Sequence, residues 1–251
     1  MFPLRDDNPT EITPIFTMGL IMACLATWVL LQGGGFDSSV LRGSVCRWGV
    51  IPGELTGATP SASLPEGMVC GEGGGAVTVV TSMFLHGSWP HLIGNLWFLW
   101  IFGNNVEDSM GHLRFLLFYL LTGVAAVGAQ AWADPGSPLP MVGASGAISG
   151  IMGAYLVLYP RARISTLFII IILVQVVWVP AWVMLGYWFL IQFMAGASQP
   201  PGQGGVAFWA HIGGFVAGVI LVKPFENRTL SNAKRARVHL SQGEIPGGGW
   251  W

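Results

Sequence analysis

Four side chains within or next to apolar stretches have types suited to hydrolysis of an acyl bond. Ser145 opens the fourth apolar run of the chain, and His211 lies at the start of the last one. A histidine that takes the proton of a serine hydroxyl makes that serine a nucleophile. His91 and Asn95 are four residues apart, so on a helix they share one face, and both can donate a hydrogen bond to an oxyanion. These residues predict a Ser–His dyad with an oxyanion hole.

Each of these residues also has a structural interpretation when it is taken alone. Ser145 is of a type favoured at a helix N-cap. A histidine such as His211 can act as a buried hydrogen-bonding group or a proton relay. His91 and Asn95 fit hydrogen bonds between helices, and His86 fits a supporting position beside His91. The catalytic hypothesis therefore depends on how the surrounding elements bring the residues together.

Glycines beside both members of the dyad predict a close approach of two helices. A pair of glycines follows Ser145, and a second pair follows His211 three and seven residues later, on its own helical face. Small residues at this spacing let helix backbones come close, and a Ser–His hydrogen bond needs about 2.6–3.2 Å. The glycines expected to support this packing are Gly143, Gly146, Gly150, Gly214 and Gly218.

The composition shows what kind of solvent these elements need. Of the 251 residues, 53% are hydrophobic and 9% are charged, and the mean hydropathy is +0.61. A soluble domain carries about 25% charged residues, so this chain predicts a lipid-embedded protein. The net charge of −1 gives no basic field for a nucleic acid partner. The 12 tryptophans fit the aromatic belts at the two membrane surfaces.

The apolar runs predict the number of spans. A span needs about 20 apolar residues. We count six apolar runs as spans, although not all of them reach that length: 14–31, 92–102 with an apolar lead at 77–85, 115–133, 145–159, 167–195 and 206–222. We predict an all-α, polytopic membrane protein, a six-transmembrane-helix bundle with a short central fourth helix. Pro180 interrupts the run at 167–195, so an interfacial stretch followed by one span is an alternative reading of that run.

The polar segments divide the chain into three parts. Residues 1–13 are expected to form a cytoplasmic N-terminus, without a signal peptide, because an acidic head precedes the first run. Residues 14–222 form the membrane domain, with an outer loop at about 32–75 and a polar turn at 104–114. Residues 223–251 are expected to form a disordered cytoplasmic tail.

The positive charges predict the orientation of the bundle. With the N-terminus inside, the outer segments hold only Arg42 and Arg47. The inner segments hold the other Arg and Lys residues: Arg5, Arg114, Arg161, Arg163, Lys223, Arg228, Lys234, Arg235 and Arg237. This is a positive-inside bias. The starts of spans two, four and six then lie at the outer side, where the four candidate residues converge.

The fourth run is too short to cross a membrane. Ser145 to Tyr159 is 15 residues, or about 22 Å, against a hydrocarbon core of about 30 Å. Ser145 is therefore expected below the outer surface, and residues 141–144 are expected to enter the membrane as irregular backbone. Such backbone is tolerated only where protein encloses it or where it lines a watery cavity. A serine at the floor of that cavity has the water that hydrolysis requires.

The predicted spans contain no Asp or Glu, so a third, carboxylate member that orients His211 is not expected. No metal set is expected either, because the chain lacks HExxH and gives His211 no partner at ligand spacing. Cys46 and Cys70 share the outer loop, and they are expected either as a disulfide or as two free thiols.

Taken together, the motifs resemble those of the rhomboid intramembrane serine proteases. They are His91-x-x-x-Asn95, Gly143-x-Ser145-Gly146 and Ala210-His211-x-x-Gly214-x-x-x-Gly218, within about Val79 to Val222. The resemblance implies a six-helix core, cleavage of single-span membrane proteins at small residues, and no cofactor. It implies that Ser145 is the nucleophile and His211 the general base. The oxyanion hole would consist of the Ser145 N–H, His91 and Asn95, and the fifth span would be a lateral gate.

The sequence departs from the family pattern at two places. Some members place a tyrosine four residues after the nucleophile, stacked on the histidine, where this chain has Ser149. The Trp-Arg pair of the first outer loop is also absent from its family position, since Arg47-Trp48 lies too early and in the opposite order. The first departure leaves open what holds the ring of His211.

Two other function classes compete with the protease. A catalytically inactive relative that binds membrane clients usually lacks the serine or the histidine, and both are present here. A small transporter or channel predicts charged residues or repeats near the midplane, and the sequence has neither. The compact layout points to a bacterial inner membrane, with both termini cytoplasmic, the active site open to the outer side, and transmembrane proteins and the lipid bilayer as partners.

Overall fold

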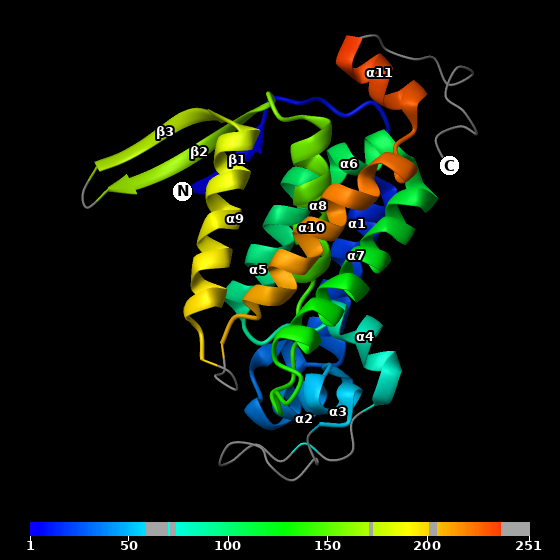
Figure 1. Cartoon of the computed structure of the whole chain (residues 1–251), viewed down its shortest axis with the longest axis vertical. Helices are drawn as coiled ribbons and strands as arrows, with labels where there is room; N and C mark the ends of the chain where they lie inside the picture. The colour runs from blue at the N-terminus through cyan, green and yellow to red at the C-terminus, as the bar shows by residue number, and fades with distance from the viewer. Residues whose placement is uncertain (59–69, 71–73, 171–172, 201–204, 237–251) are drawn as a thin grey trace.

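The computed structural model describes residues 1–58, 70, 74–170, 173–200 and 205–236 (Figure 1). The chain is mostly helical, as predicted. Its α-helices are α1 Ile15–Leu30, α2 Ser38–Trp48, α3 Pro52–Thr56, α4 Thr78–Thr81, α5 Trp89–Phe98, α6 Asn104–Met110, α7 His112–Ala133, α8 Ser145–Leu158, α9 Ala181–Ser198, α10 Phe208–Phe225 and α11 Arg228–Ala236. The strands are β1 Phe2–Asp6, β2 Arg163–Ile170 and β3 Leu173–Pro180. The shorter helical turns are η1 Gly33–Gly35, η2 Gly75–Val77, η3 Ser82–Phe84 and the π-helical η4 Leu99–Gly103.

Within the described residues, three helices are long and apolar enough to cross a membrane: α7, α9 and α10. Helices α1 and α8 and the segment Gly75–Phe84 are apolar but shorter. Helix α5 continues without a break through η4 into α6. The apolar lead at 77–85 is not part of that helix. It forms the separate η2, α4 and η3 turns, because Ser88 caps α5 and Pro90 lies in its first turn.

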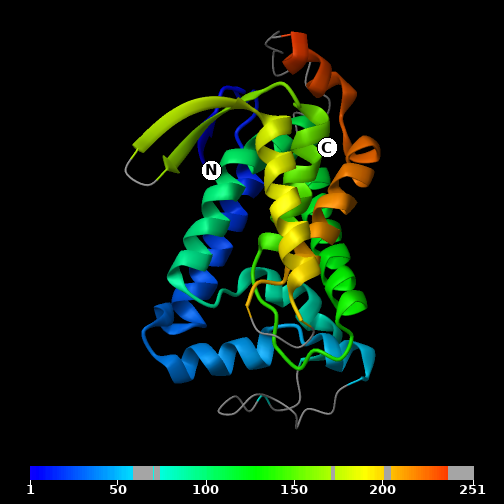
Figure 2. The same cartoon turned by 60° about the vertical axis from the view of Figure 1, so that its left-hand side comes forward.

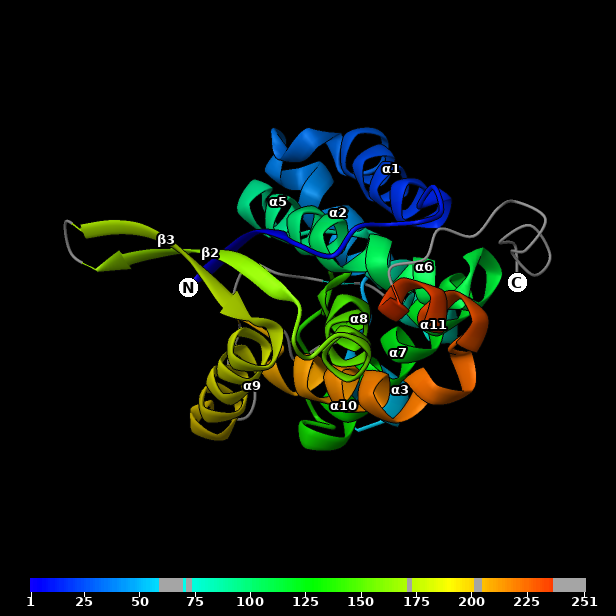
Figure 3. The ribbon, with the colours of Figure 1, turned by 90° about the horizontal axis from the view of Figure 1, so that it is seen from above.

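Helix α8 lies in the middle of the bundle, between α5, α7, α9 and α10 (Figure 3). Eleven of its 14 residues are buried. Its contact with α10 is backbone against backbone, because a Cβ on Gly214 would lie 2.0 Å from the carbonyl oxygen of Gly146. A Cβ on Gly218 would lie at the same distance from the carbonyl oxygen of Gly150. The predicted close approach of the two helices is therefore present, but only the α10 glycines make room for it, because a Cβ on Gly146 or Gly150 would meet α7 instead.

A three-stranded antiparallel sheet, in the order β1-β2-β3, departs from the all-α prediction. Strands β2 and β3 form a hairpin that pairs Arg163 with Pro180 at its base, and β1 pairs with the other edge of β2. The run at 167–195 is thus not one span: its first half is strand, and α9 begins after Pro180. The β-branched Ile and Val residues of this half favour extended backbone.

The polar segment at 104–114 is not a turn, because the helix continues to Met110. Glu107 and Asp108 are buried there. The Glu107 carboxylate accepts the backbone N–H groups of Phe16 and Thr17 at 2.9 and 2.7 Å, and so caps the start of α1. Asp108 accepts the N–H of Ile12 at 2.8 Å. Both acidic side chains thus accept hydrogen bonds from backbone N–H groups at or just before the start of α1.

The tail is helical where it is described, contrary to the predicted disorder from residue 223. Helix α10 extends to Phe225, and α11 follows from Arg228 to Ala236. The buried ammonium group of Lys234 anchors α11, since it donates to Asp108 at 2.6 Å and to Asn105 at 2.7 Å. The rest of the predicted tail, 237–251, lies outside the described residues.

Helices α2 and α3, within the segment predicted as the outer loop, lie at the opposite end of the molecule from β1 and α11 (Figure 1). Figure 2 shows α2 lying crosswise beneath the ends of the longer helices. Asp37 caps α2 by accepting the N–H groups of Ser39 and Val40. Cys46, near the end of α2, forms a disulfide with Cys70, so the disulfide alternative is the correct one.

The backbone contact of α8 and α10 predicts a large effect of one added methyl group. In Gly218→Ala the Cβ meets a carbonyl oxygen of α8, and the helices must separate, at a cost of about 1–3 kcal/mol for such overpacking. The thermal unfolding midpoint in detergent is expected to fall. Gly128→Ala on α7 is the matched control, because nothing lies within 4 Å of its Cβ. Equal midpoints for the two variants would contradict the contact.

The half-buried carboxyl group of Asp6, the last residue of β1, predicts a pH dependence of the stability of the protein. Burial raises the pKa of the Asp6 carboxyl from 3.8 to about 6, against the opposing effects of the Tyr155 hydroxyl and the Lys234 ammonium group. The folded chain therefore binds this proton more tightly than the unfolded chain. The resulting stability is fully present below pH 3.8 and is lost as the pH rises through about 6.

Asp6→Asn removes this titration. We expect the unfolding midpoint of the wild type to fall relative to that of Asp6→Asn as the pH is raised between these two values. Thermal scans of both proteins in the same detergent measure the difference. A difference that does not change with pH would show that Asp6 has an ordinary affinity for its proton.

Candidate active site

Ser145 and His211 are in hydrogen-bond contact although 66 residues separate them. Ser145 is the first residue of α8 and His211 lies in the first turn of α10, and both are half-buried. The distance from Ser145 Oγ to His211 Nε2 is 2.8 Å. This lies within the range for a nucleophile and its base. The glycine contact of α8 and α10 begins one residue after the serine and three residues after the histidine.

The segment before Ser145 is irregular backbone held by hydrogen bonds from two directions. Met141 and Val50 exchange both backbone hydrogen bonds, at 2.7 and 3.0 Å. The N–H of Gly143 donates to the carbonyl oxygen of Ser82 at 2.9 Å. Gly143 has φ +124°, a conformation that side chains other than that of glycine rarely adopt. The chain thus enters α8 at a fixed angle, as the predicted irregular backbone, and Met141, Val142 and Gly143 line a cavity.

His91 and Asn95 lie against this segment on α5. A Cβ on Gly143 would come within 2.6 Å of His91 Nε2 and 3.6 Å of Asn95 Nδ2, so both side chains face the backbone just before Ser145. His91 lines the same cavity as Ser145 and His211. Asn95 is buried behind it, and its amide donates to the carbonyl oxygen of His91 at 3.1 Å.

His86 lies beside His91, as expected of a supporting residue. The two rings meet edge to face at a centroid distance of 5.2 Å. Gln32 holds the backbone of His86, donating to its carbonyl oxygen at 2.7 Å and accepting its N–H at 2.9 Å. The His86 ring is fully buried and packs against the His91 ring by van der Waals contact, without a hydrogen bond between the two rings.

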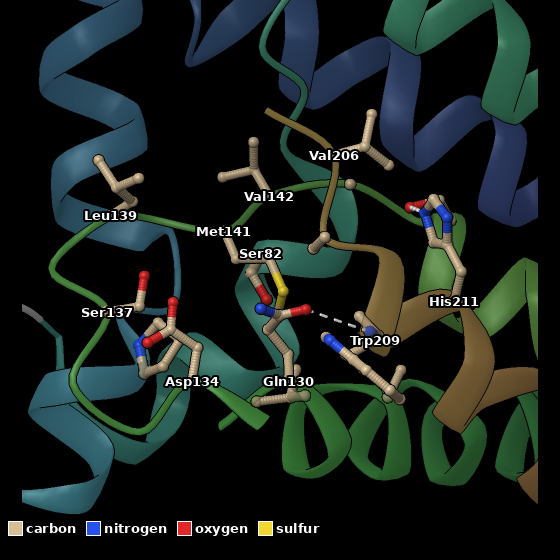
Figure 4. A pocket seen from close by; sticks show the side chains of 18 of the residues that line it. Ser82, Gln130, Asp134, Ser137, Leu139, Met141, Val142, Val206, Trp209 and His211 are labelled. Atoms are coloured by element: carbon tan, nitrogen blue, oxygen red, sulfur yellow. Dashed lines mark hydrogen bonds between the residues drawn. The ribbon is translucent and has the colours of Figure 1, made fainter. Parts of the chain in front are cut away.

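A cavity of about 650 Å³ opens in front of the dyad. Its walls come from the loop before α8, from η3 and α7, and from the start of α10, as the labelled side chains in Figure 4 show. Gln130 of α7 accepts the backbone N–H of Ala210 at 3.3 Å, next to the histidine. Trp209 and Val206 line the α10 side. The cavity is large enough to hold an extended peptide segment of a few residues.

The sequence did not predict the two side chains that hold the ring of His211. Gln192 of α9 lies with Oε1 2.7 Å from His211 Nδ1. The ring of Trp188, one turn earlier on α9, lies 6.0 Å from the imidazole at an interplanar angle of 35°. Ser149, at the position of the family's tyrosine, instead donates its hydroxyl to the carbonyl oxygen of Ser145 at 2.6 Å.

One signal for Gln192 was present in the sequence. It is the only amide or charged side chain between Ala181 and Ala197, and a polar group within a span needs a hydrogen-bond partner. Among the described residues, no group of three or more His, Cys, Asp or Glu side chains is placed to hold a metal ion.

The arrangement suits acyl transfer. The hydroxyl of Ser145 has a ring nitrogen within reach to accept its proton. The first N–H groups of α8 have no partner within their own helix, and they carry the positive end of the helix dipole. An anion that forms on a carbonyl bound to Ser145 would therefore lie near N–H donors and beside His91.

Comparison with known proteins agrees with this chemistry. The family model described as the Rhomboid domain matches residues 74–226, which include every candidate residue named so far for the dyad and oxyanion hole. Rhomboid-like protein 11, chloroplastic, of Arabidopsis thaliana is 32% identical over 157 residues, 57% of this chain and 50% of that protein. Rhomboid protease GluP of Bacillus subtilis is 34% identical over 163 residues, 61% of this chain and 28% of that protein.

A third relative, Rhomboid protein 1, mitochondrial, of Saccharomyces cerevisiae, is 28% identical over 153 residues, 57% of this chain and 40% of that protein. The chain thus spans half or less of the length of these relatives. The match to the family model covers helices α4 to α10 and the candidate site. It leaves out the first helix, α1, and most of the predicted outer loop.

Proposed function

The chain belongs to the rhomboid family, and from that premise we propose that it is an intramembrane serine endopeptidase with a Ser145–His211 dyad. Its substrates are membrane proteins that present a peptide bond in or near a transmembrane segment. The observation that carries this proposal is the 2.8 Å contact of Ser145 Oγ and His211 Nε2 at the wall of the cavity. No cofactor takes part in the proposed reaction.

Six helices cross the membrane in this proposal. They are α1, the continuous helix from α5 to α6, α7, the short central α8, α9 and α10. Both termini are cytoplasmic, residues 14–222 form the membrane domain, and the cavity opens to the outer side. The membrane is a bacterial inner membrane. Helix α9 borders the path by which a substrate helix enters, which fits its small buried share of four residues in 18.

The catalytic steps follow from the atoms in place. His211 Nε2 takes the proton of Ser145 as Oγ forms a bond to the carbonyl carbon of the substrate. The carbonyl oxygen becomes an anion, which accepts hydrogen bonds from the Ser145 N–H, His91 and Asn95. The C–N bond then breaks as His211 gives its proton to the leaving amine, and an acyl-enzyme ester is left. Water hydrolyses that ester, again with His211 as base.

The glycines have a supporting role in this mechanism. Gly214 and Gly218 let α10 touch the backbone of α8, and that contact keeps Ser145 near His211, while Gly146 and Gly150 leave room for Ala126 and Thr122 of α7. Gly143 leaves room for the His91 ring. An added side chain at any of these positions shifts either the dyad or the oxyanion hole.

We expect Ser145→Ala and His211→Ala each to abolish cleavage of a fluorescent single-span reporter by the protein reconstituted in vesicles. The first variant lacks the nucleophile and the second lacks its base. Ser198→Ala is the matched control, because that serine only donates to the carbonyl oxygen of Met194 in its own helix. Unfolding midpoints close to that of the wild type establish that the variants fold.

The outcomes separate the competing functions. Cleavage that persists in Ser145→Ala rules out the dyad mechanism. If the wild type binds the reporter but never cleaves it, the protein is a client-binding member of the family rather than a protease.

Asn95→Ala is expected to lower kcat by about 10- to 100-fold while KM changes little, because an oxyanion donor acts on the transition state and not on the bound substrate. Ile93→Ala serves as control, since Ile93 lies on the same helix with 55% of its surface exposed. Steady-state kinetics on the same reporter measure both constants. An unchanged kcat would remove Asn95 from the oxyanion hole.

A further inference from the structure

We propose that Gln192 is a positioning residue for the dyad: its amide oxygen fixes the tautomer and the ring orientation of His211. This inference rests on the proposed function and deepens it. It assigns to α9 the task that a carboxylate performs in many serine hydrolases. It also answers how His211 is held when residue 149 is a serine.

The argument starts from the two ring nitrogens of His211. A neutral imidazole has one N–H donor and one bare acceptor nitrogen. Ser145 can lose its proton only to a bare Nε2, so Nδ1 must carry the hydrogen. That hydrogen needs an acceptor, and the amide oxygen of Gln192 lies 2.7 Å from Nδ1. The two contacts, at 2.7 and 2.8 Å, therefore specify a single tautomer, the one that can act as a base.

The opposite tautomer does not fit the side chains as they are placed. With the hydrogen on Nε2, the bare Nδ1 would face the lone pairs of the Gln192 oxygen, and only an amide turned over to present its NH2 group would accommodate it. Ser145 would then have to accept a hydrogen bond from the ring and would keep its own proton. Loss of the Gln192 acceptor removes the hydrogen bond that holds Nδ1–H, and the fraction of His211 rings in the active arrangement falls.

The ring orientation depends on the same helix. Trp188 and Gln192 are four residues apart on α9, so they present one face to His211. The Trp188 ring lies against the imidazole, tilted by 35°, while Gln192 holds its Nδ1 edge. Phe208, one turn before His211, meets the ring nearly at right angles at 6.5 Å. The imidazole thus has aromatic neighbours beside it and hydrogen bonds at both nitrogens.

The neighbouring positions on α9 indicate that the polarity of Gln192 is specific. Ile191 and Phe193 on either side are apolar and exposed on the helix surface, with 42% and 47% of their area accessible. A glutamine among such residues costs free energy in lipid unless its amide finds a partner. His211 is the partner that it finds.

The test compares Gln192→Met with the wild type, as full-length chains in vesicles with the same single-span reporter. Methionine keeps the length and shape of the side chain and removes the acceptor. We expect kcat to fall by about 10- to 100-fold, part of what a general base contributes, and KM to change by less than about threefold. Ile191→Met is the matched control on the same helix and is expected to cleave at the wild-type rate.

Gln192→Glu is the conservative rescue, because a carboxyl group, ionised or protonated, restores an acceptor oxygen for Nδ1–H at the same chain length. We expect it to recover most of the kcat that Gln192→Met loses. A residue that only joined α9 to α10 would behave differently, because loss of that link in Gln192→Met would lower the unfolding midpoint in parallel with the rate. If Gln192→Met does not fold, Gln192→Asn takes its place, since it keeps the amide but withdraws the acceptor by one methylene.

Labelling of Ser145 by a fluorophosphonate gives a second readout without a peptide substrate. The rate of labelling is expected to fall in Gln192→Met and to recover in Gln192→Glu. An unchanged kcat and labelling rate in Gln192→Met would overturn the inference, and so would a Gln192→Glu variant as slow as Gln192→Met. A wild type that neither cleaves nor labels would instead overturn the proposed function, and this inference with it.

Discussion

The site depends on one contact, the backbone of α8 against the backbone of α10. No side chain separates the helices at Gly214 and Gly218, which touch the carbonyl oxygens of α8 directly. Dispersion contacts between such close surfaces hold helices together in lipid, where the hydrophobic effect contributes little. Because Ser145 and His211 each stand at the start of one of these helices, the axial match of the two glycine pairs sets the distance between the hydroxyl and the ring.

The rest of the molecule keeps α8 at the right depth. At one end the irregular loop before Ser145 is bonded to Val50, just after α2, and to Ser82 of η3. At the other end Tyr155 donates to Asp6, which also accepts from Asn105 of α6. A 14-residue helix cannot reach both surfaces of a membrane by itself. The hydrogen bonds at its two ends therefore hold α8 in position within the bundle.

The sequence predicted the parts of the fold that depend on local pattern. The glycine spacing, the short fourth run and the shared depth of His91, Ser145 and His211 follow from residue types and from the alternation of apolar runs. It did not predict that Glu107 and Asp108 are buried, because most of their partners are backbone N–H groups 90 or more residues away. An acidic pair in a short polar segment looks the same whether its partner is water or a distant helix end.

The hairpin and the tail were missed for a similar reason. A run of Ile and Val fits a span by hydropathy and a strand by shape, and the pairing of β2 with β1 and β3 decides between them. Gln192 was missed because α9 is apolar around most of its surface, so periodicity does not say which face meets α10. Only the packing of the two helices brings residue 192 to residue 211.

An amide rather than a carboxylate beside His211 suits the surroundings of this dyad. An ionised carboxylate on a lipid-facing helix loses its hydration, and the attraction of a neutral imidazole does not compensate for that loss. An amide oxygen accepts the same Nδ1–H hydrogen bond without a charge that needs solvation. An amide stabilises the positive charge of the imidazolium less than a carboxylate does. Electrostatic stabilisation of the transition state therefore depends on the other groups of the site. The start of α8, with its free N–H groups and the positive end of its dipole, lies there beside Ser145. In such a dyad, Gln192 supplies orientation and α8 supplies electrostatic stabilisation.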